Sequence, residues 1–230
     1  MSKGELIWIA ESDDSCDNRL IEELVNCFMN NPDVVLAFSR SVVIDEKSHL
    51  KKVWHTQVGN NYAFMMDGLN FIKYHLKRNN DIANASAAVF RKSVLKNIPK
   101  DYMEYNGCGD WLFWIYVCEQ GKVCYSPYLM NYFRHHGSNT TSHQDMNGNN
   151  DHEILSIIRY LEEMGLCRKR DLVFIKLHRL EFHERWCKFE NEKAEQQFKK
   201  EWGITPMTYL FWYIQKMIGT FHSQTGRFLW

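Results

Sequence analysis

The stretch GELIWIAESDD near the N-terminus constrains the fold more than any other, because an apolar run ends abruptly in three acids. The residues LIWIA, at positions 6–10, would place apolar side chains on both faces of an extended segment. This pattern is typical of a strand that is covered on both sides, as in a parallel sheet under helices. Glu11, Asp13 and Asp14 would then lie at the carboxyl end of the strand, where open α/β sheets bind ligands.

These acids have two interpretations. Clusters of oxygen ligands suit hard cations such as magnesium or manganese, which bind through one or two carboxylates plus ligand phosphates. Asp13, Asp14 and Asp17 are equally ordinary turn and cap residues before a helix. The residues by themselves leave both interpretations open.

Composition limits the classes of protein to consider. The chain has 230 residues with 28 basic and 28 acidic side chains, so no net positive charge favours nucleic acid. Its seven cysteines include no CxxC pair and match no zinc spacing, so we expect free thiols in a reducing compartment. No signal-like segment and no membrane-spanning run is evident. We therefore expect a cytoplasmic protein, at most peripheral at the inner face of the membrane.

The order of predicted elements indicates an α/β fold. A helix with apolar residues at helical spacing follows the acids, and the β-branched run VVLAFSRSVVI at 34–44 predicts a second strand. This β-α-β order implies a right-handed crossover and a parallel or mixed sheet. Further elements are expected as a helix at 65–78, an extended segment at 84–90, a short basic helix after it, a helix after residue 110, and two short strands joined through Ser126 and Pro127.

The polar loop at 137–151 is the clearest break in composition. It divides the chain into an α/β part at 1–145 and a helical part at 151–230. Within the helical part, main helical stretches are expected at 151–164 and 170–200, and Pro206 opens a last apolar helix.

A second candidate site is Asp110, in the motif CGDW. Gly107 and Gly109 allow a sharp turn or a close approach of the backbone. Asp110 would stand at the first turn of an apolar helix, where a carboxylate can act as a general base. Asp is also a favoured helix cap, and one residue can serve both roles.

The third candidate is the motif YFRHHGSN. Arg134 and His136 leave a strand end beside a polar loop. Arg can clamp a diphosphate, and neutral His can ligate a metal. Isolated clusters of this kind are also common as solvated strand ends.

Taken in order, three segments spanning about 140 residues carry a family resemblance: GELIWIAESDD, NASAAVFRKSVL and GDWLFWIYVCEQGKVCYSPYLMNYFRHHGSNTTS. Together they resemble the second half of a family-2 glycosyltransferase of the bacterial cell-surface polysaccharide type. The resemblance implies a partial GT-A fold, a Rossmann-like mixed sheet flanked by helices, followed by a C-terminal helical region. It also implies inverting transfer of a sugar from a UDP- or GDP-sugar to an acceptor hydroxyl of a glycan or lipid-linked molecule.

The resemblance assigns roles to the acids. Asp13 would bind the nucleotide near its ribose, and Asp14, with Glu11, would hold Mn²⁺ or Mg²⁺ on the diphosphate. Asp110 would be the general base. Glu11 stands where the family has Asp, and Gly109 replaces an acid before the base.

The resemblance gives the remaining pair a supporting role. Arg134 would bind the diphosphate, and His136 would help to hold the metal. The similarity begins at Gly4, already at the acidic strand, so the nucleoside-binding half of the sheet would be missing. We therefore expect a fragment, or a chain that works with a partner supplying that half.

Two further interpretations remain open. One is a non-catalytic remnant that serves as an interaction or carbohydrate-binding module. The other concerns the aromatic segment at 206–230, which would either contact a membrane surface or pack against the rest of the chain.

Overall fold

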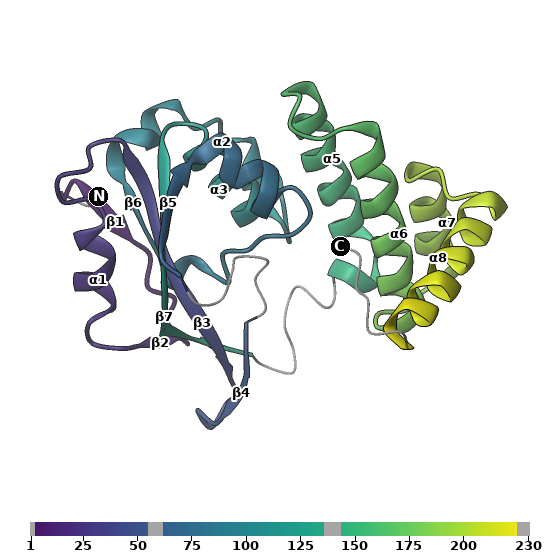
Figure 1. The fold of residues 1–230 in the computed structure, drawn as a ribbon, viewed down its shortest axis with the longest axis horizontal. Coiled ribbons are helices and arrows are strands. Elements are labelled where there is room, and N and C mark those ends of the chain that lie inside the picture. Colours follow the sequence, from purple (N-terminus) through teal and green to yellow (C-terminus); the bar gives the residue numbers. More distant parts are fainter. Residues whose placement is uncertain (1–2, 55–61, 136–143, 225–230) are drawn as a thin grey trace.

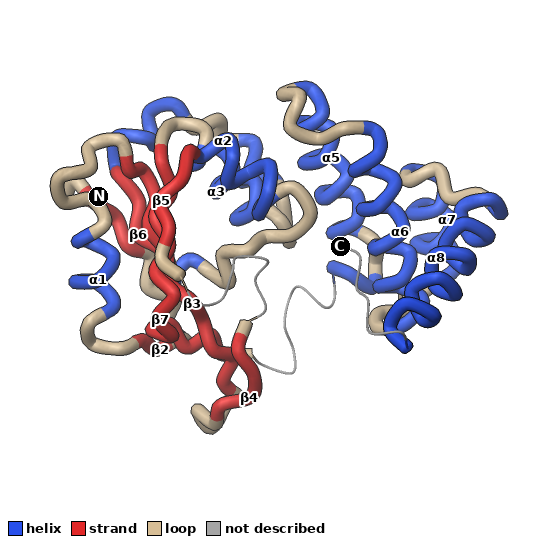
Figure 2. The backbone as a smooth tube through the Cα atoms, in the orientation of Figure 1, coloured by secondary structure: helices blue, strands red, loops and turns tan. Residues whose placement is uncertain are grey.

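The computed structural model describes residues 3–54, 62–135 and 144–224, without side-chain detail for residue 215 and from residue 218 onward. A curled mixed sheet with helices on both faces forms one end of the molecule, and a group of helices forms the other (Figure 1). Figure 2 shows the same division, with the strands together at one end. The expected α/β class is confirmed at this level.

The strands form a single sheet in the order β1-β6-β3-β7-β2, with β4 paired to β3 and β5 paired to β7. Strands β3 and β7 are parallel, and the other pairs are antiparallel. Because β1 and β3 both run antiparallel to β6, they are parallel to each other, as the β-α-β order predicts. The bounds are β1 (Leu6–Trp8), β2 (Ser15–Cys16), β3 (Val34–Ile44), β4 (Leu50–Val53), β5 (Phe64–Asp67), β6 (Ala88–Arg91) and β7 (Lys122–Arg134).

Helices cover both faces of this sheet. Helix α1 packs Leu20 and Leu24 on one face, and α3 packs Leu112 and Trp114 on the other. The helices are α1 (Leu20–Asn26), α2 (Gly68–Phe71), α3 (Gly109–Cys118), α5 (Asn149–Glu163), α6 (Lys169–Arg185), α7 (Glu192–Glu201) and α8 (Pro206–Gln224), with a π-helical turn at Ile72–Leu76 and 3₁₀ turns at Ala85–Ala87, Lys92–Asn97 and Asp101–Glu104.

Strand β1 differs from its prediction. It lies at one end of the sheet and pairs with β6 alone among the described strands. Leu6 packs toward α1 and Ile7 toward the opposite face, but both are only half-buried, and Trp8 is 37% exposed. The expectation of a strand fully covered on both sides was wrong, because an edge position leaves part of each side chain in water.

Three other expected elements are corrected. Residues 65–67, the start of the helix expected at 65–78, instead belong to β5 and pair with β7, and Asp67 then caps α2 by accepting a hydrogen bond from Asn70 N at 3.2 Å. The two strands expected around Pro127 are one strand whose register shifts there. The helix expected at 170–200 breaks after Arg185, and Asn191 caps the new helix α7.

The helical part shares the core of the sheet. One hydrophobic cluster contains Trp111 of α3 together with Ile158 of α5, Leu180 of α6 and Trp212 of α8. Among the described residues, no helix is long and apolar enough to cross a bilayer. Helix α8 nonetheless exposes a row of large apolar side chains: Met207, Leu210, Phe211, Ile214 and Met217.

The cysteines are not all free. Cys27, at the end of α1, and Cys124, in β7, form a disulfide with 6.2 Å between their Cα atoms. The other five cysteines are unpaired, as expected. The prediction was wrong for this pair, because it relied on spacing in the sequence, and 97 residues separate the two.

Candidate active site

The acidic segment joins the two ends of the sheet, because it lies between β1 at one end of the strand order and β2 at the other. After β1, residues 9–14 lead to β2, which pairs antiparallel with the end of β7. The register places Ser15 opposite Tyr132 and Cys16 opposite Asn131. This pairing brings Asp14 beside Arg134, 120 residues away in the sequence.

Asp14 makes long-range contacts that a simple turn residue would not make. Its Oδ1 accepts a hydrogen bond from Arg134 N at 2.9 Å, and its Oδ2 accepts one from the side-chain amide of Asn84. The turn interpretation holds for the backbone, since Asp14 N donates to Glu11 O at 3.3 Å. It also holds for Asp17, which accepts from Arg19 N at 2.9 Å just before α1. The carboxylate of Asp14 instead joins the acidic segment to β7.

The Arg134 side chain is occupied by the protein. Its guanidinium donates to Asp13 O at 2.7 Å, to Asp45 O at 2.6 Å and to the Ser48 hydroxyl at 3.1 Å. These bonds join the acidic segment to the turn between β3 and β4. Arg134 therefore lies at the predicted site, but its side chain shapes that site in addition to supplying positive charge.

Glu11 is the acid of the segment at 11–14 whose carboxyl pKa is raised. Burial raises the pKa of its carboxyl, and the negative charges of Asp14, Asp13 and Asp110 raise it further, as does a hydrogen bond with Asp14. Like charges at short range disfavour ionisation. The charge of Asp110, 99 positions along the chain from Glu11, has the smallest effect of the three on the pKa of the Glu11 carboxyl.

Asp110 stands in the first turn of α3, as predicted, although Cys108 occupies the cap position. Its carboxylate accepts from Trp111 N at 2.7 Å and from the Asn80 amide at 3.0 Å. Asp110 keeps an exposed surface, yet desolvation raises the pKa of its carboxyl. These two observations are compatible, because water contacts the Asp110 side chain directly while protein atoms surround it at longer range. A raised pKa suits a residue that must accept a proton.

The chemistry of the acids fits partial ligation of a hard cation. Within the described ranges, no three His, Cys, Asp or Glu side chains converge closely enough to hold an ion by themselves. Mg²⁺ generally takes one or two carboxylates and completes its shell with water and phosphate oxygens. Glu11 and Asp14 can supply that number, and a cation there would relieve the repulsion that raises the pKa of Glu11. His136 lies outside the described residues.

Sequence reasoning missed the amides that connect the two acidic sites. Asn84 Oδ1 accepts from Asn131 Nδ2 at 2.8 Å, while its own amide binds Asp14. Asn80, four residues earlier, binds Asp110. The segment NNDIAN carries both Asn80 and Asn84, and its density of amides before a strand was the available signal.

Comparison with known proteins adds no family. No protein-family model matches the chain, and no curated protein is similar to it in sequence. The glycosyltransferase resemblance therefore stays a prediction.

Proposed function

We propose that this chain is a glycosyltransferase of GT-A type that uses a nucleotide-sugar and a divalent cation. The observation that supports the proposal best is that the charges of Asp14, Asp13 and Asp110, which come from two distant segments, all raise the pKa of the Glu11 carboxyl. Carboxyl groups whose pKa is raised by neighbouring like charges cluster at functional sites. Glu11 and Asp14 would bind the cation, and Asp110, in a separate segment, would act as the base.

In the proposed reaction, Asp110 accepts the proton of an acceptor hydroxyl as that oxygen attacks the anomeric carbon. The bond from that carbon to the diphosphate breaks, and the sugar is transferred with inversion. Glu11 and Asp14 hold the cation, which when bound stabilises the negative charge on the departing diphosphate. Asn84 orients the carboxylate of Asp14 through its hydrogen bond.

A calorimetric titration with UDP or GDP, with and without Mn²⁺, tests the proposal. We expect Mn²⁺-dependent binding that Asp14→Asn abolishes, because Asn preserves the shape of the side chain but removes its charge. Asp33→Asn is a matched control, since Asp33 is an exposed acid that pairs with Lys122 at 3.3 Å. Nucleotide binding that is indifferent to Mn²⁺, or unaltered in Asp14→Asn, would refute the proposal.

One observation favours a second candidate function, that of an interaction module. The outer edge of β1 has no partner strand among the described residues, and Trp8 and Ile9 beside it are 37% and 44% exposed. An open edge is a template for pairing with another chain. Sugar transfer by this chain alone, lost in Asp110→Asn with the fold retained, would exclude a purely non-catalytic role.

We also propose that a lipid-linked acceptor is met at a membrane surface through α8. The support is the exposed row that includes Leu210, Ile214 and Met217, which are 52%, 43% and 73% exposed. Apolar helix faces of this kind bind bilayer interfaces. Co-sedimentation with vesicles that contain anionic lipid should fall when Leu210 and Ile214 are replaced with Ser, and unchanged sedimentation would contradict the proposal.

A further inference from the structure

The loop before Asp110 is held by a residue of the helical part. Glu153 of α5 accepts hydrogen bonds from three consecutive backbone amides: Asn106 N at 2.7 Å, Gly107 N at 3.0 Å and Cys108 N at 2.8 Å. Glu153 is only 7% exposed. Successive amides that point to one place form a concave anion site. Here a carboxylate of the same chain occupies it, and that carboxylate would be costly to bury without these donors.

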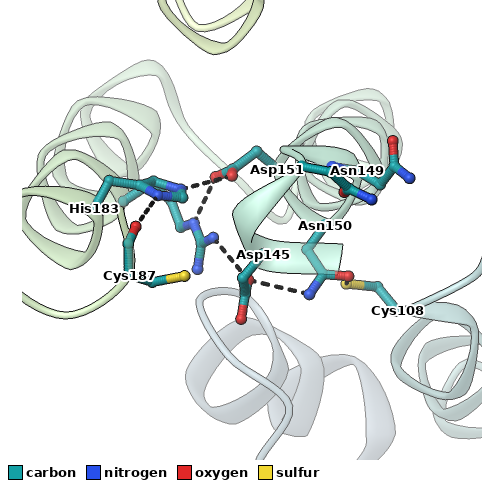
Figure 3. A network of polar contacts seen from close by, with 9 residues as sticks. Cys108, Asp145, Asn149, Asn150, Asp151, His183 and Cys187 are labelled. Carbon is teal, nitrogen blue, oxygen red and sulfur yellow. Dashed lines mark hydrogen bonds and ion pairs between the residues drawn. The ribbon is translucent and has the colours of Figure 1, made fainter. Parts of the chain in front are cut away.

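Asn150, one turn earlier on α5, packs against the same loop at Gly107 and Cys108. A Cβ atom on Gly107 would lie 1.8 Å from Asn150 Oδ1, so only glycine permits this approach. Cys108 Sγ lies 3.9 Å from the same oxygen. Figure 3 shows Asn150 between Cys108 and Asp145, which accepts from Asn150 Nδ2 at 3.0 Å.

The start of α5 is in turn fixed to α6. Asp151 accepts from Arg179 Nε and from His183 Nε2, both at 2.7 Å, and is 1% exposed. Figure 3 shows His183 facing Asp151 across the two helices. Asp145 lies 3.3 Å from Arg179 Nη2. The contacts therefore run without interruption from α6 through α5 to the loop.

We propose that Glu153 is a positioning residue for Asp110: it clamps the loop at 106–108 and so sets where α3 begins and where its first carboxylate stands. The inference rests on the proposed role of Asp110 as the base. A displacement of about 1 Å in a reacting group can reduce the rate about 100-fold. The last of these amides, at Cys108, lies two positions before Asp110, so loss of its hydrogen bond to Glu153 displaces the base directly.

The first test measures release of the loop without any assay of activity. In Glu153→Gln the new side-chain amide faces backbone N–H donors, so at least one of the three hydrogen bonds is lost. Alkylation of Cys108 by iodoacetamide, followed by peptide mass spectrometry, should become on the order of tenfold faster, the size expected from losing a hydrogen bond to a charged group. Cys118, buried at the end of α3, reports global unfolding and should keep its rate.

Two further variants sharpen the result. Burial raises the pKa of the Cys108 thiol first, and the charge of Glu153 raises it next, so Gln at this position alters both access and charge. Glu153→Asp keeps the charge but withdraws it by one methylene, so faster alkylation there reports opening alone. Glu163→Gln, an exposed Glu on the same helix, should leave the Cys108 rate unchanged.

The second test measures transfer. With UDP- or GDP-sugar and Mn²⁺, Glu153→Gln should reduce kcat at least tenfold and leave KM for the nucleotide-sugar unchanged, with partial recovery in Glu153→Asp. Equal acceleration at Cys108 and Cys118, no acceleration at Cys108, or an unaltered kcat would each overturn the positioning role. If the unmodified chain transfers no sugar, the role of Asp110 falls and the positioning role falls with it, while alkylation still shows whether Glu153 holds the loop.

Discussion

Replacing Asp151 with Asn should destabilise the chain strongly, because it removes the buried carboxylate that Arg179 and His183 share as a hydrogen-bond acceptor. Asn keeps a single side-chain oxygen, so it can satisfy Arg179 or His183 but offers neither of them a charge. Removing one partner of a buried ion pair costs about 3–5 kcal/mol. Asp145 remains 3.3 Å from Arg179 Nη2 and compensates in part, so we expect about 3 kcal/mol, at the lower end of that range.

Thermal unfolding monitored by circular dichroism measures this loss. In a chain of this length, each kcal/mol shifts Tm by about 2–4 °C, so the expected decrease is about 6–12 °C. Glu181→Gln is the matched control on α6. Glu181 pairs with Arg185 at 2.9 Å, but the two side chains are 35% and 47% exposed, and such a pair near the surface contributes about 0.5 kcal/mol or less.

The loss should depend on pH with a defined sign. Burial acts to raise the pKa of Asp151, but the hydrogen bond from His183 and the charge of Arg179 outweigh it and hold the pKa below 3.8. A carboxyl with a lowered folded-state pKa stabilises the fold above its unfolded value, and that contribution disappears as the pH falls through the folded value. The difference between the two proteins should therefore be full at neutral pH and shrink below pH 3.8. A loss no larger than in Glu181→Gln, or one that persists unchanged in strong acid, would refute this account of the network.

Three other outcomes are expected. Gly107→Ala should lower stability by about 1–3 kcal/mol in urea unfolding, because its Cβ would overlap Asn150 Oδ1; an unchanged midpoint would show that α5 does not press on the loop. Arg134→Lys should lower Tm by differential scanning fluorimetry, since Lys lacks the planar fork that reaches Asp13 O and Asp45 O together; equal Tm values would dismiss this bracing role. Mn²⁺ affinity measured by calorimetry should rise with pH above 4.5 as Glu11, whose carboxyl pKa is raised, releases its proton; an affinity that is flat in this range would argue against Glu11 as a ligand.

Much of the fold was predictable, because hydrophobic periodicity carries it. The bounds of β3 match the apolar run at 34–44, and α3 begins where the glycines of CGDW indicate. The failures share a cause. Met65 to Asp67 have helix-compatible composition, but pairing with β7 overrides that preference. The edge position of β1 likewise depends on a partner strand 80 residues away, which no local pattern reveals.

The acids of the candidate site were predictable from the sequence, but the residues that hydrogen-bond to them or to the loop before Asp110 were not. Glu11, Asp14 and Asp110 were identified by their place after a strand or at a helix start, and the charges of Asp14 and Asp110 raise the pKa of the Glu11 carboxyl. Asn84 was missed because an amide carries no charge and makes no recognisable spacing, although it binds the carboxylate of Asp14. Glu153 was missed for a different reason. It lies on the far side of a polar loop that separates two compositions.

The polar loop at 137–151 does not by itself divide the chain into two independently folded units. Helix α5 contacts both ends of α3: Glu153 binds the amides before it, and Tyr160 donates to Glu119 just after it at 2.8 Å. Lys77, which follows the π-helical turn, pairs with Asp171 of α6 at 3.0 Å, with both side chains largely buried. An isolated α/β part would leave three loop amides and the apolar surface of α3 exposed to water. The change in composition at 137–151 therefore marks a change from sheet to helix within one shared core, and the helices belong to the support of the proposed base.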